Sequence, residues 1–369
     1  MELAAKGAVT ELPVYDEHRG GFAALTGRRV LIYWPHGLGD FVHLAYVLPL
    51  LEPSNEYFLT RFGDDFVHLY DTAAIAHPIY SGERRIGAGS PPHFGVNFKK
   101  IRNRVERLTI PEPLRSRIES ARIDTVLYTD YPEKTGRVAY PFHTKARYII
   151  GKLVAPERLA QFDLSQPLQP GIPFTAPDAS RRLVEDRLRA AVEPGDRLYL
   201  ISPGGHTQLD KIWPEASVAE FARLVRARDA RARVVVIDER TSDAIGREPG
   251  LAPTTADLFA GLDVPFAHLL TTLIRASHAY AGVSSGPLHC AIAIGGRPTA
   301  GIWLAHWPEY YDEPSEAVHL VGPNVYRKKL DQRIGAYTKK QAPALRYRIV
   351  PFRERMPAAA DVLDALDSA

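Results

Sequence analysis

Three short clusters of glycine, hydroxyl and charged residues mark where this sequence could carry out chemistry. The first is the segment HGLGD at residues 36–40, which follows the apolar run Arg29–Trp34. Glycines let a backbone approach another molecule closely, and ligands of open α/β sheets bind where strands end. Asp40 then has two interpretations, a general base that faces a substrate or the N-cap of the next helix. The spacing departs from the Gly-x-Gly-x-x-Gly dinucleotide fingerprint.

The second cluster follows the apolar run Arg197–Ser202 and reads PGGHT, with a lysine four residues further on in KIWP. A glycine-rich turn after a strand presents backbone N–H groups, and a lysine supplies a point charge for a phosphate oxygen. The absence of Gly-Lys-Ser/Thr excludes a P-loop. The alternative interpretation is a surface loop with a solvated Lys211.

The third cluster, SSGPLH at residues 284–289, follows another apolar run and begins a helical pattern. Hydroxyls, unpaired amide N–H groups and the positive end of a helix dipole would converge there, which suits a diphosphate. Proline near the first turn fits a helix start. His289 could donate to a phosphate, or it could be a hydrogen-bonded core residue of an apolar helix.

The elements that must position these clusters alternate between strand and helix. Strands are predicted at Arg29–Trp34, Glu56–Thr60 and Thr125–Tyr128, with a helix-compatible segment at Pro113–Ala121. Such alternation predicts a parallel α/β sheet. The stretch Gln166–Pro177 is proline-rich and shows neither the apolar period of a helix nor that of a strand, so it predicts an extended linker.

After the linker the alternation begins again. The predicted helices are Asp178–Ala191, Val218–Ala227, Phe266–Ala276, Leu288–Ile294 and Ala358–Leu366, and the predicted strands are Arg197–Ser202, Val234–Asp238, His278–Val283 and Thr299–Leu304. The basic stretch Tyr326–Arg348 is expected to be largely solvated. We predict an extension at 1–28, Rossmann-like domains at 29–170 and 171–350, and a C-terminal helix at 351–369 that packs back on the N-terminal domain.

Composition excludes several classes of protein. The 369 residues exceed what one core usually supports, which favours two domains. A hydrophobic share of 45% and a charged share of 24% indicate an ordinary globular chain. The formal charge of +3 predicts no nucleic-acid partner, and a single cysteine excludes intrachain disulfides and cysteine metal clusters. We expect a cytoplasmic location and at most peripheral membrane contact, because no signal or membrane-spanning segment is evident.

Together the three clusters resemble glycosyltransferase family 9, the heptosyltransferase family, over roughly residues 29 to 325. The resemblance implies the GT-B architecture, with two Rossmann-like domains that face each other across a cleft. The family's proposed catalytic base corresponds to Asp40, and its donor-half lysine to Lys211. The family's Asp-Ser/Thr-Gly-Pro-x-His signature is matched by SSGPLH, except that Ser284 replaces the aspartate. That substitution puts the heptose preference in doubt.

The resemblance implies a full set of site residues. On the acceptor side these are His36, Gly37 and Gly39, and on the donor side they are Gly204, Gly205, His206, Thr207, Lys211, Asp238, Glu239, Ser284, Ser285, Gly286 and His289. Asp238 and Glu239 are alternatives for a nucleoside contact. A basic group, Arg84, Arg85, Lys99, Lys100, Arg102 and Arg104, is either a solvated face or an anion-binding surface for the acceptor.

The implied reaction is one inverting displacement. An acceptor hydroxyl, deprotonated by Asp40, attacks the anomeric carbon of a nucleoside-diphosphate sugar, with ADP the expected nucleotide and a saccharide or glycolipid, such as a lipopolysaccharide core, the expected acceptor. No cofactor and no metal are expected, since no Asp-x-Asp pair is placed to hold one. The alternatives are a sugar-nucleotide epimerase of similar fold and a non-catalytic sugar-nucleotide-binding protein.

Overall fold

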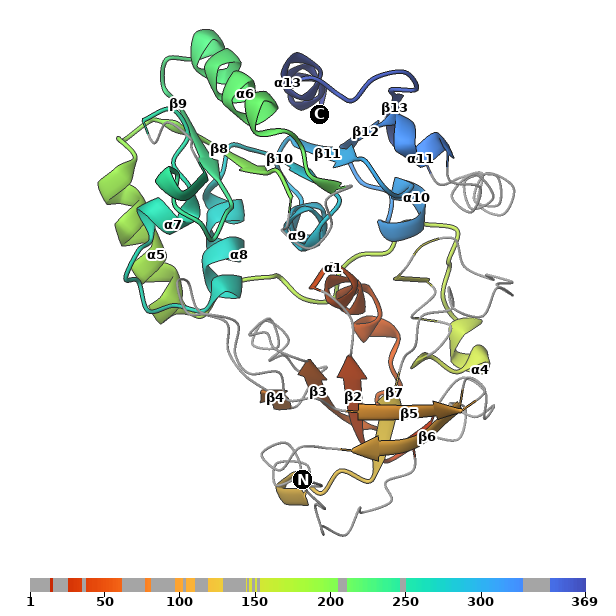
Figure 1. The fold of residues 1–369 in the computed structure, drawn as a ribbon. Helices are drawn as coiled ribbons and strands as arrows, with labels where there is room; N and C mark the ends of the chain where they lie inside the picture. Colours follow the sequence, from red (N-terminus) through yellow and green to blue (C-terminus); the bar gives the residue numbers. More distant parts are fainter. Residues whose placement is uncertain are drawn as a thin grey trace, which may run out of the picture.

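Parallel β-sheets from the two halves of the chain form the frame of the molecule, which we describe from a computed structural model (Figure 1). The structure describes residues 14–15, 26–34, 38–61, 77–80, 97–101, 104–109, 119–128, 144, 146–147, 150, 153–204, 211–245, 250–327 and 346–369. Within this part of the chain, none of the helices combines the length and hydropathy that crossing a bilayer demands.

The N-terminal sheet is built, among the described residues, from the strands β1 Val14–Tyr15, β2 Arg29–Trp34, β3 Glu56–Arg61, β4 His77–Tyr80 and β7 Thr125–Tyr128. Their order is β1-β7-β2-β3-β4 and all pairs are parallel. The central strand β2 is an apolar run because both faces of a parallel sheet are covered. Val14–Tyr15, from the predicted extension, forms an edge strand of this sheet.

Short helices follow β2 directly. Helix α1 spans Leu38–Val42, and the 3-10 helices η3 and η4 span His43–Tyr46 and Leu48–Leu50. A separate antiparallel hairpin consists of β5 Asn97–Ile101 and β6 Arg104–Thr109, within the stretch that carries the basic group. The side chains of that group lie outside the described residues.

The C-terminal sheet contains, in the described ranges, β8 Arg197–Ser202, β9 Ala232–Val236, β10 Ala279–Val283, β11 Thr299–Trp303, β12 Val318–Val321 and β13 Arg348–Pro351. The order β13-β12-β11-β10-β8-β9 is parallel throughout. The chain passes from β8 to β9 on one side, and it then crosses from β9 to β10 on the other side of β8. The carboxyl ends of β8 and β10 therefore form the switch point at which open sheets bind ligands.

Helices surround this second sheet. They are α5 Asp178–Ala191, α6 Glu215–Arg228, α7 Thr255–Leu258, α8 Phe266–Ala276, α9 Gly286–Ile294, α10 Pro308–Tyr311, α11 Pro323–Arg327 and α13 Ala359–Ser368, with a 3-10 turn η8 at Asp243–Ile245. Helix α4 Pro156–Leu159 lies instead beside the N-terminal half, where Nε of Arg158 donates to the carbonyl of Leu50 at 2.9 Å. Helix α13 packs on α6 and on β10 to β12 (Figure 1). This placement corrects the expectation that the last helix returns to the N-terminal half, because its apolar face completes the core under α6.

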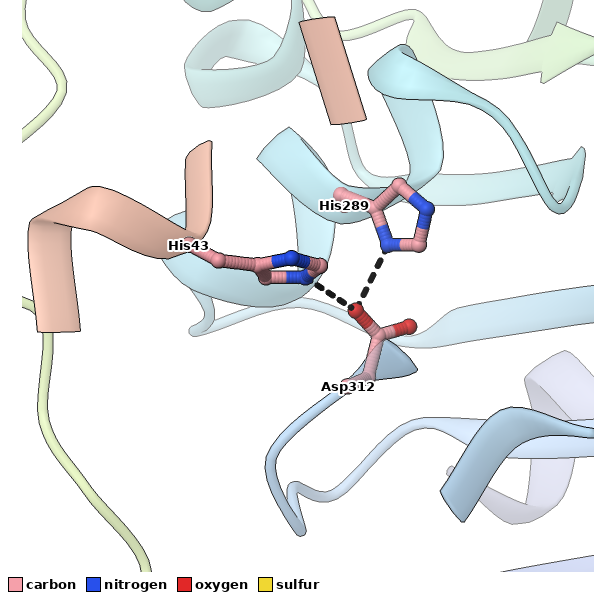
Figure 2. A group of neighbouring side chains, drawn as sticks. All are labelled: His43, His289 and Asp312. Carbon is pink, nitrogen blue, oxygen red and sulfur yellow. Dashed lines mark hydrogen bonds and ion pairs between the residues drawn. The ribbon is translucent and has the colours of Figure 1, made fainter. Parts of the chain in front are cut away.

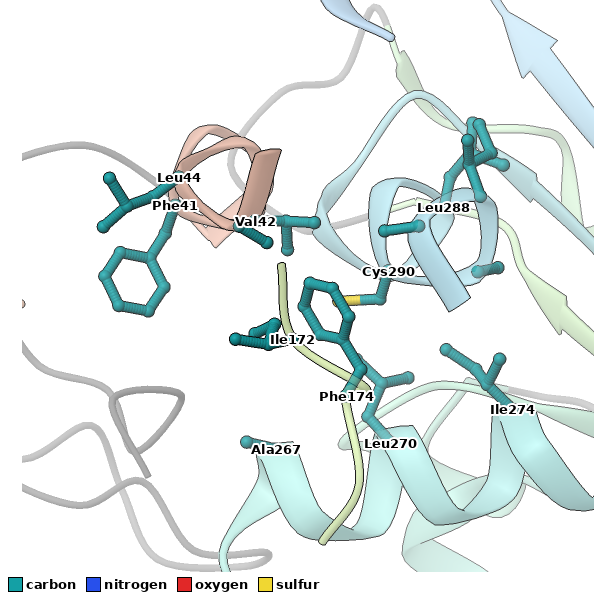
Figure 3. Packing of buried hydrophobic residues seen from close by; sticks show 14 of the residues in the cluster. Phe41, Val42, Leu44, Ile172, Phe174, Ala267, Leu270, Ile274, Leu288 and Cys290 are labelled. Carbon is teal, nitrogen blue, oxygen red and sulfur yellow. The ribbon is translucent and has the colours of Figure 1, made fainter. Parts of the chain in front are cut away.

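One apolar cluster crosses the linker, residues 166–177, and joins both halves. Figure 3 shows Phe174 of the linker beside Cys290 of α9 and Leu270 of α8, with Phe41 and Val42 of α1 on the other side of the linker. Phe174 is fully buried and has a φ of +47°, a strained value for a side-chain-bearing residue. Burial of the ring offsets this strain and fixes the linker between the halves.

Candidate functional site

Helices α1 and α9 touch at their glycines, which brings the first and third sequence clusters into direct contact. A Cβ added at Gly39 would lie 2.4 Å from Cδ2 of His289, and one added at Gly286 would lie 2.7 Å from Cδ2 of Leu38. Each helix therefore presents a glycine to a side chain of the other. Separations this short exclude a side chain at either position without a shift of its neighbour.

The turn between β10 and α9 retains unused hydrogen-bonding groups. Ser285 is the N-cap of α9 in an extended conformation, but its side chain makes no capping bond in the described part of the chain. Its Oγ is buried and has no hydrogen-bond partner among the described residues. Ser284 is buried and its N–H donates to the carbonyl of Ile302 at 3.1 Å. The buried Ser285 hydroxyl and the first-turn amides of α9 thus lie at the positive end of the helix.

The second cluster leaves the same edge of the sheet. Gly282 of β10 pairs with Ser202 of β8, so the loops that follow these strands start side by side. Gly204 has a φ of +138°, and a Cβ there would lie 2.9 Å from the carbonyl oxygen of Lys211. Glycine is needed because the loop folds back on itself at this point.

Trp213 anchors the Lys211 segment. Its ring is buried, its Nε1 donates to the carbonyl of Pro357 at 3.0 Å, and its N–H donates to Pro203 at 2.7 Å. Lys211 itself is half-buried at the start of this segment. Gly205, His206 and Thr207 lie outside the described residues, so their predicted donor contacts remain predictions.

Asp238 and Glu239, the alternative nucleoside contacts, have different surroundings just beyond β9. Asp238 is buried, and its carboxylate forms an ion pair with Arg240 at 3.0 Å and accepts the Arg240 N–H at 2.9 Å. Glu239 is exposed. Which of the two contacts a nucleoside stays a prediction with both alternatives open.

The predicted base lies on α1, whose backbone the structure describes. Gly39 and Asp40 are both within Leu38–Val42. The side chain of Asp40, together with His36 and Gly37, lies outside the described residues. The role of Asp40 therefore remains a prediction that rests on the position of its helix.

A buried group that the sequence analysis missed lies directly beneath this contact. His43 of η3, His289 of α9 and Asp312, the residue after α10, converge from three segments (Figure 2). Oδ1 of Asp312 lies 2.6 Å from Nδ1 of His289 and 3.4 Å from Nε2 of His43. With Nδ1 facing the carboxylate, the other ring nitrogen of His289 is directed toward Gly39. Asp312 thereby fixes the orientation of a predicted donor-binding residue.

Two imidazoles and a carboxylate are also ligands for zinc or iron, and the potential ligand atoms lie within 4.8 Å of one another. Two ligands of a tetrahedral zinc ion would, however, stand about 3.3 Å apart. The separation of 2.6 Å between Nδ1 of His289 and Oδ1 of Asp312 is a hydrogen-bond length. In this geometry the group is a hydrogen-bonded cluster.

The charge of Asp312 is stabilised by the same neighbours. Burial alone would raise its pKa, but the charge and hydrogen bond of His289, followed by those of His43, outweigh burial and hold the pKa well below its usual range. The backbone is fixed as well, because Tyr347 Oη donates to the carbonyl of Asp312 at 3.1 Å. Asp312 therefore remains an anion inside the protein.

A second buried carboxylate follows at once. Glu313 pairs with Arg147 of the N-terminal half, with Nη2 and Oε2 3.0 Å apart and both side chains almost fully buried. Glu313 also accepts hydrogen bonds from the hydroxyl of Thr144 and, at 3.2 Å, from the N–H of Leu168 in the linker. Adjacent acidic residues thus bind two different segments of the N-terminal half.

Comparison with known proteins identifies the fold. No family model and no curated protein matches the sequence. The structure is similar to a family 9 glycosyl transferase from Veillonella parvula DSM 2008, with 13% identity, a TM-score of 0.55, and 93% of this chain and 97% of that chain covered. It is also similar to the ADP-heptose lipopolysaccharide heptosyltransferase II of E. coli, with 16% identity, a TM-score of 0.54, and 92% and 98% covered. The chain therefore has the α/β fold of GT-B glycosyltransferases, which confirms the predicted fold class.

Proposed function

We propose that this chain is an inverting, metal-independent glycosyltransferase that transfers a sugar from a nucleoside diphosphate to a saccharide or glycolipid acceptor. The observation that carries the proposal is the packing of Gly39 on His289. It puts the helix of the predicted base, Asp40, against the helix that begins at the predicted diphosphate site. Two clusters far apart in sequence meet as a transferase of this fold requires.

The donor diphosphate would lie at the carboxyl edge of the C-terminal sheet. The Ser285 hydroxyl and the first-turn amides of α9 would bind its oxygens, and Lys211 would supply a positive charge from the neighbouring loop. His289, oriented by Asp312, would complete this set. Charge that develops on the departing nucleoside diphosphate would then be stabilised by groups already in place.

The acceptor hydroxyl would enter from the N-terminal side, where Asp40 would remove its proton as the new glycosidic bond forms. Removal of such a base typically lowers the rate roughly 100- to 10,000-fold. We propose ADP-heptose as the donor class to test first, because the similar E. coli protein is an ADP-heptose heptosyltransferase. Ser284 leaves a neutral side chain where the family has an aspartate, so the donor sugar could differ from heptose. We place the enzyme in the cytoplasm, in peripheral contact with an anionic lipid acceptor at the inner membrane.

A thermal-shift titration with ADP, GDP, UDP and dTDP tests the donor site first. A nucleotide that binds the folded state must raise Tm, and we expect ADP to give the largest rise and Lys211→Ala to reduce it. Failure of every nucleoside diphosphate to raise Tm would exclude the donor assignment.

A transfer assay with the bound ADP-sugar and a saccharide acceptor tests the chemistry. We expect Asp40→Asn to abolish transfer while ADP affinity is retained, and EDTA to leave the rate unchanged. Epimer formed from the nucleotide sugar without acceptor would support an epimerase instead. Donor binding with no transfer to any acceptor would support a non-catalytic binding protein.

A further inference from the structure

A cavity lies at the opposite end of α9 from the proposed donor site. Its volume is about 590 Å³, within the usual range for small-molecule pockets. The turn after α9 (residues 295–297), the linker residues 168–173 and the loop 313–317 form its walls, and Tyr46 closes it from the N-terminal half. Because α9 starts at the carboxyl edge of β10 and ends before β11 begins, this cavity is separate from the switch point of the sheet.

Arg297 is half-buried and lines the cavity. Its Nε and Nη1 are buried and have no hydrogen-bond partner among the described residues, and no ion pair of Arg297 occurs in the same part of the chain. Burial, followed by the charge of Arg275, lowers its pKa from 12.5 to about 10. A desolvated cation without an anionic partner costs stability.

The other charged groups of the cavity do not neutralise Arg297. Arg275 also lines the cavity and donates through Nε to the carbonyl of Phe174 at 3.1 Å. Glu313 also lines the cavity, but Arg147 already neutralises it. Glu316 is exposed at the rim. Among the described residues that line the cavity, two are arginines, and Glu316 is the carboxylate for which no ion pair is seen.

The linker wall is fixed without a ligand. The Gly171 N–H donates to the carbonyl of Ala45 at 2.6 Å, and a Cβ at Gly171 would lie 2.8 Å from Cδ of Pro49. Arg275 holds the same linker segment through its hydrogen bond to the carbonyl of Phe174. The wall is thus attached to both halves of the molecule, and the cavity is preformed.

We propose that this cavity binds a small molecule that carries an oxyanion, such as a phosphorylated or carboxylated sugar, and that Arg297 is its principal ligand. Guanidinium donors match phosphate and carboxylate oxygens in geometry as well as charge. Binding would place a negative charge beside the Arg297 guanidinium, with Nη2 as the donor in reach, and would offset the repulsion between Arg297 and Arg275. The proposal does not depend on the donor site or on the transferase activity.

Thermal-shift titrations of the full chain with inorganic phosphate and with citrate, at constant ionic strength, test this site. We expect Tm to rise by about 2–5 °C at about 100 times Kd. Arg297→Met should raise the Tm of the ligand-free protein, because it removes a buried unpaired charge, and should abolish the response to the anion. Arg297→Lys should retain a weaker response. A response to phosphate alone assigns a phosphorylated ligand, and a response to citrate alone a carboxylated one.

Arg226→Met is the matched control, because Arg226 is an exposed arginine of α6 that does not line the cavity. This variant loses the same charge and should respond like the wild type. The ¹⁵N–¹H resonance of the Arg297 Nε should shift during the titration, and should do so with saturating ADP present. The proposal is wrong if neither anion raises Tm, if wild type and Arg297→Met respond alike, or if Arg297→Met lowers the Tm of the ligand-free protein.

Discussion

His319 illustrates how one buried residue can set the acid stability of the protein. It lies fully buried on β12, and its Nδ1 accepts a hydrogen bond from Trp303 Nε1 at 2.9 Å. Burial lowers its pKa from 6.5 to about 4, although the charge of Asp312 acts in the opposite direction. Both the buried surroundings and the hydrogen bond from Trp303 therefore favour the neutral form of the imidazole.

We predict that the free energy of unfolding falls as the pH decreases from 6.5 to 4. In this window the unfolded chain binds a proton at His319 that the folded chain does not. The contribution of neutral His319 to the free energy of unfolding is therefore fully present above pH 6.5 and is lost as the pH falls toward 4. A pKa difference of this size corresponds to about 3 kcal/mol. His319→Asn keeps an acceptor for Trp303 but cannot titrate, so its urea midpoint should change less between pH 7 and pH 4.5.

The control is His278→Asn, which removes an exposed histidine and should preserve the wild-type pH dependence. Asp312 does not interfere, because a lowered carboxyl pKa affects stability only below the usual range of aspartate. Equal pH dependence in wild type and His319→Asn would contradict the assignment.

Single residues also show what the sequence alone cannot reveal. The segment SSGPLH identified His289, yet neither His43 nor Asp312 carries a local signal. Asp312 lies 23 positions from His289 and 269 positions from His43. A contact over such a distance depends on how the two sheets are placed, and spacing within a motif contains no information about that.

At the scale of elements, the contact between α1 and α9 depends on two glycines at which a larger side chain would collide with the other helix. A Cβ at Gly39 would collide with the imidazole of His289, a rigid ring that Asp312 holds in place. A Cβ at Gly286 would lie within 3.0 Å of Cβ, Cγ and Cδ2 of Leu38, so a rotamer change of Leu38 cannot relieve that collision either. The first collision can be relieved only by displacing a buried hydrogen-bonded group.

We therefore predict that Gly39→Ala and Gly286→Ala each lower stability by about 1–3 kcal/mol, the usual cost of overpacking. Urea unfolding of the purified variants provides the measurement. Gly250→Ala is the control, since a Cβ there meets nothing within 4 Å. If Gly39→Ala were as stable as Gly250→Ala, the close packing of α1 on α9 would have to be abandoned.

The elements that the sequence predicted well are those with a strong apolar pattern. The ends of β2, α5, β8 and α8 agree with the predicted ranges because each buries a continuous run or one clear face. Strand β13 was missed because it is an exposed edge strand that ends in Pro351, so it lacks both the pattern and the composition of a buried strand. Strand β9 ends at Val236, two residues before the predicted end at Asp238.

At the scale of the whole molecule, Arg147 and Glu313 connect the N-terminal half, the linker and the C-terminal half through one buried ion pair. Nε of Arg147 lies 3.1 Å and 3.2 Å from the two oxygens of Glu313, and its remaining donors bind the carbonyls of Leu164 and Gln166. The guanidinium is fully buried. Burial removes both charged groups from water. The ion pair and its hydrogen bonds offset the cost of this desolvation only while both charges are present.

We predict that Arg147→Met lowers the free energy of unfolding by about 3–5 kcal/mol, because it leaves the carboxylate of Glu313 buried without its cation. The double variant Arg147→Met/Glu313→Leu should be more stable than Arg147→Met, since it removes the stranded charge as well. Urea denaturation of both single variants and the double variant gives the coupling energy directly.

The matched comparison is the exposed pair Arg189–Asp186 of α5, whose removal by Arg189→Met should have little effect. Salt separates the two cases further: a buried pair is poorly screened, so the cost of Arg147→Met should be the same in low and in high NaCl. If the double variant were no more stable than Arg147→Met, the stability lost would come from the carbonyl contacts of Arg147 in the linker. The halves would then be held together by the linker's backbone, and the charge of Glu313 would make no net contribution to their association.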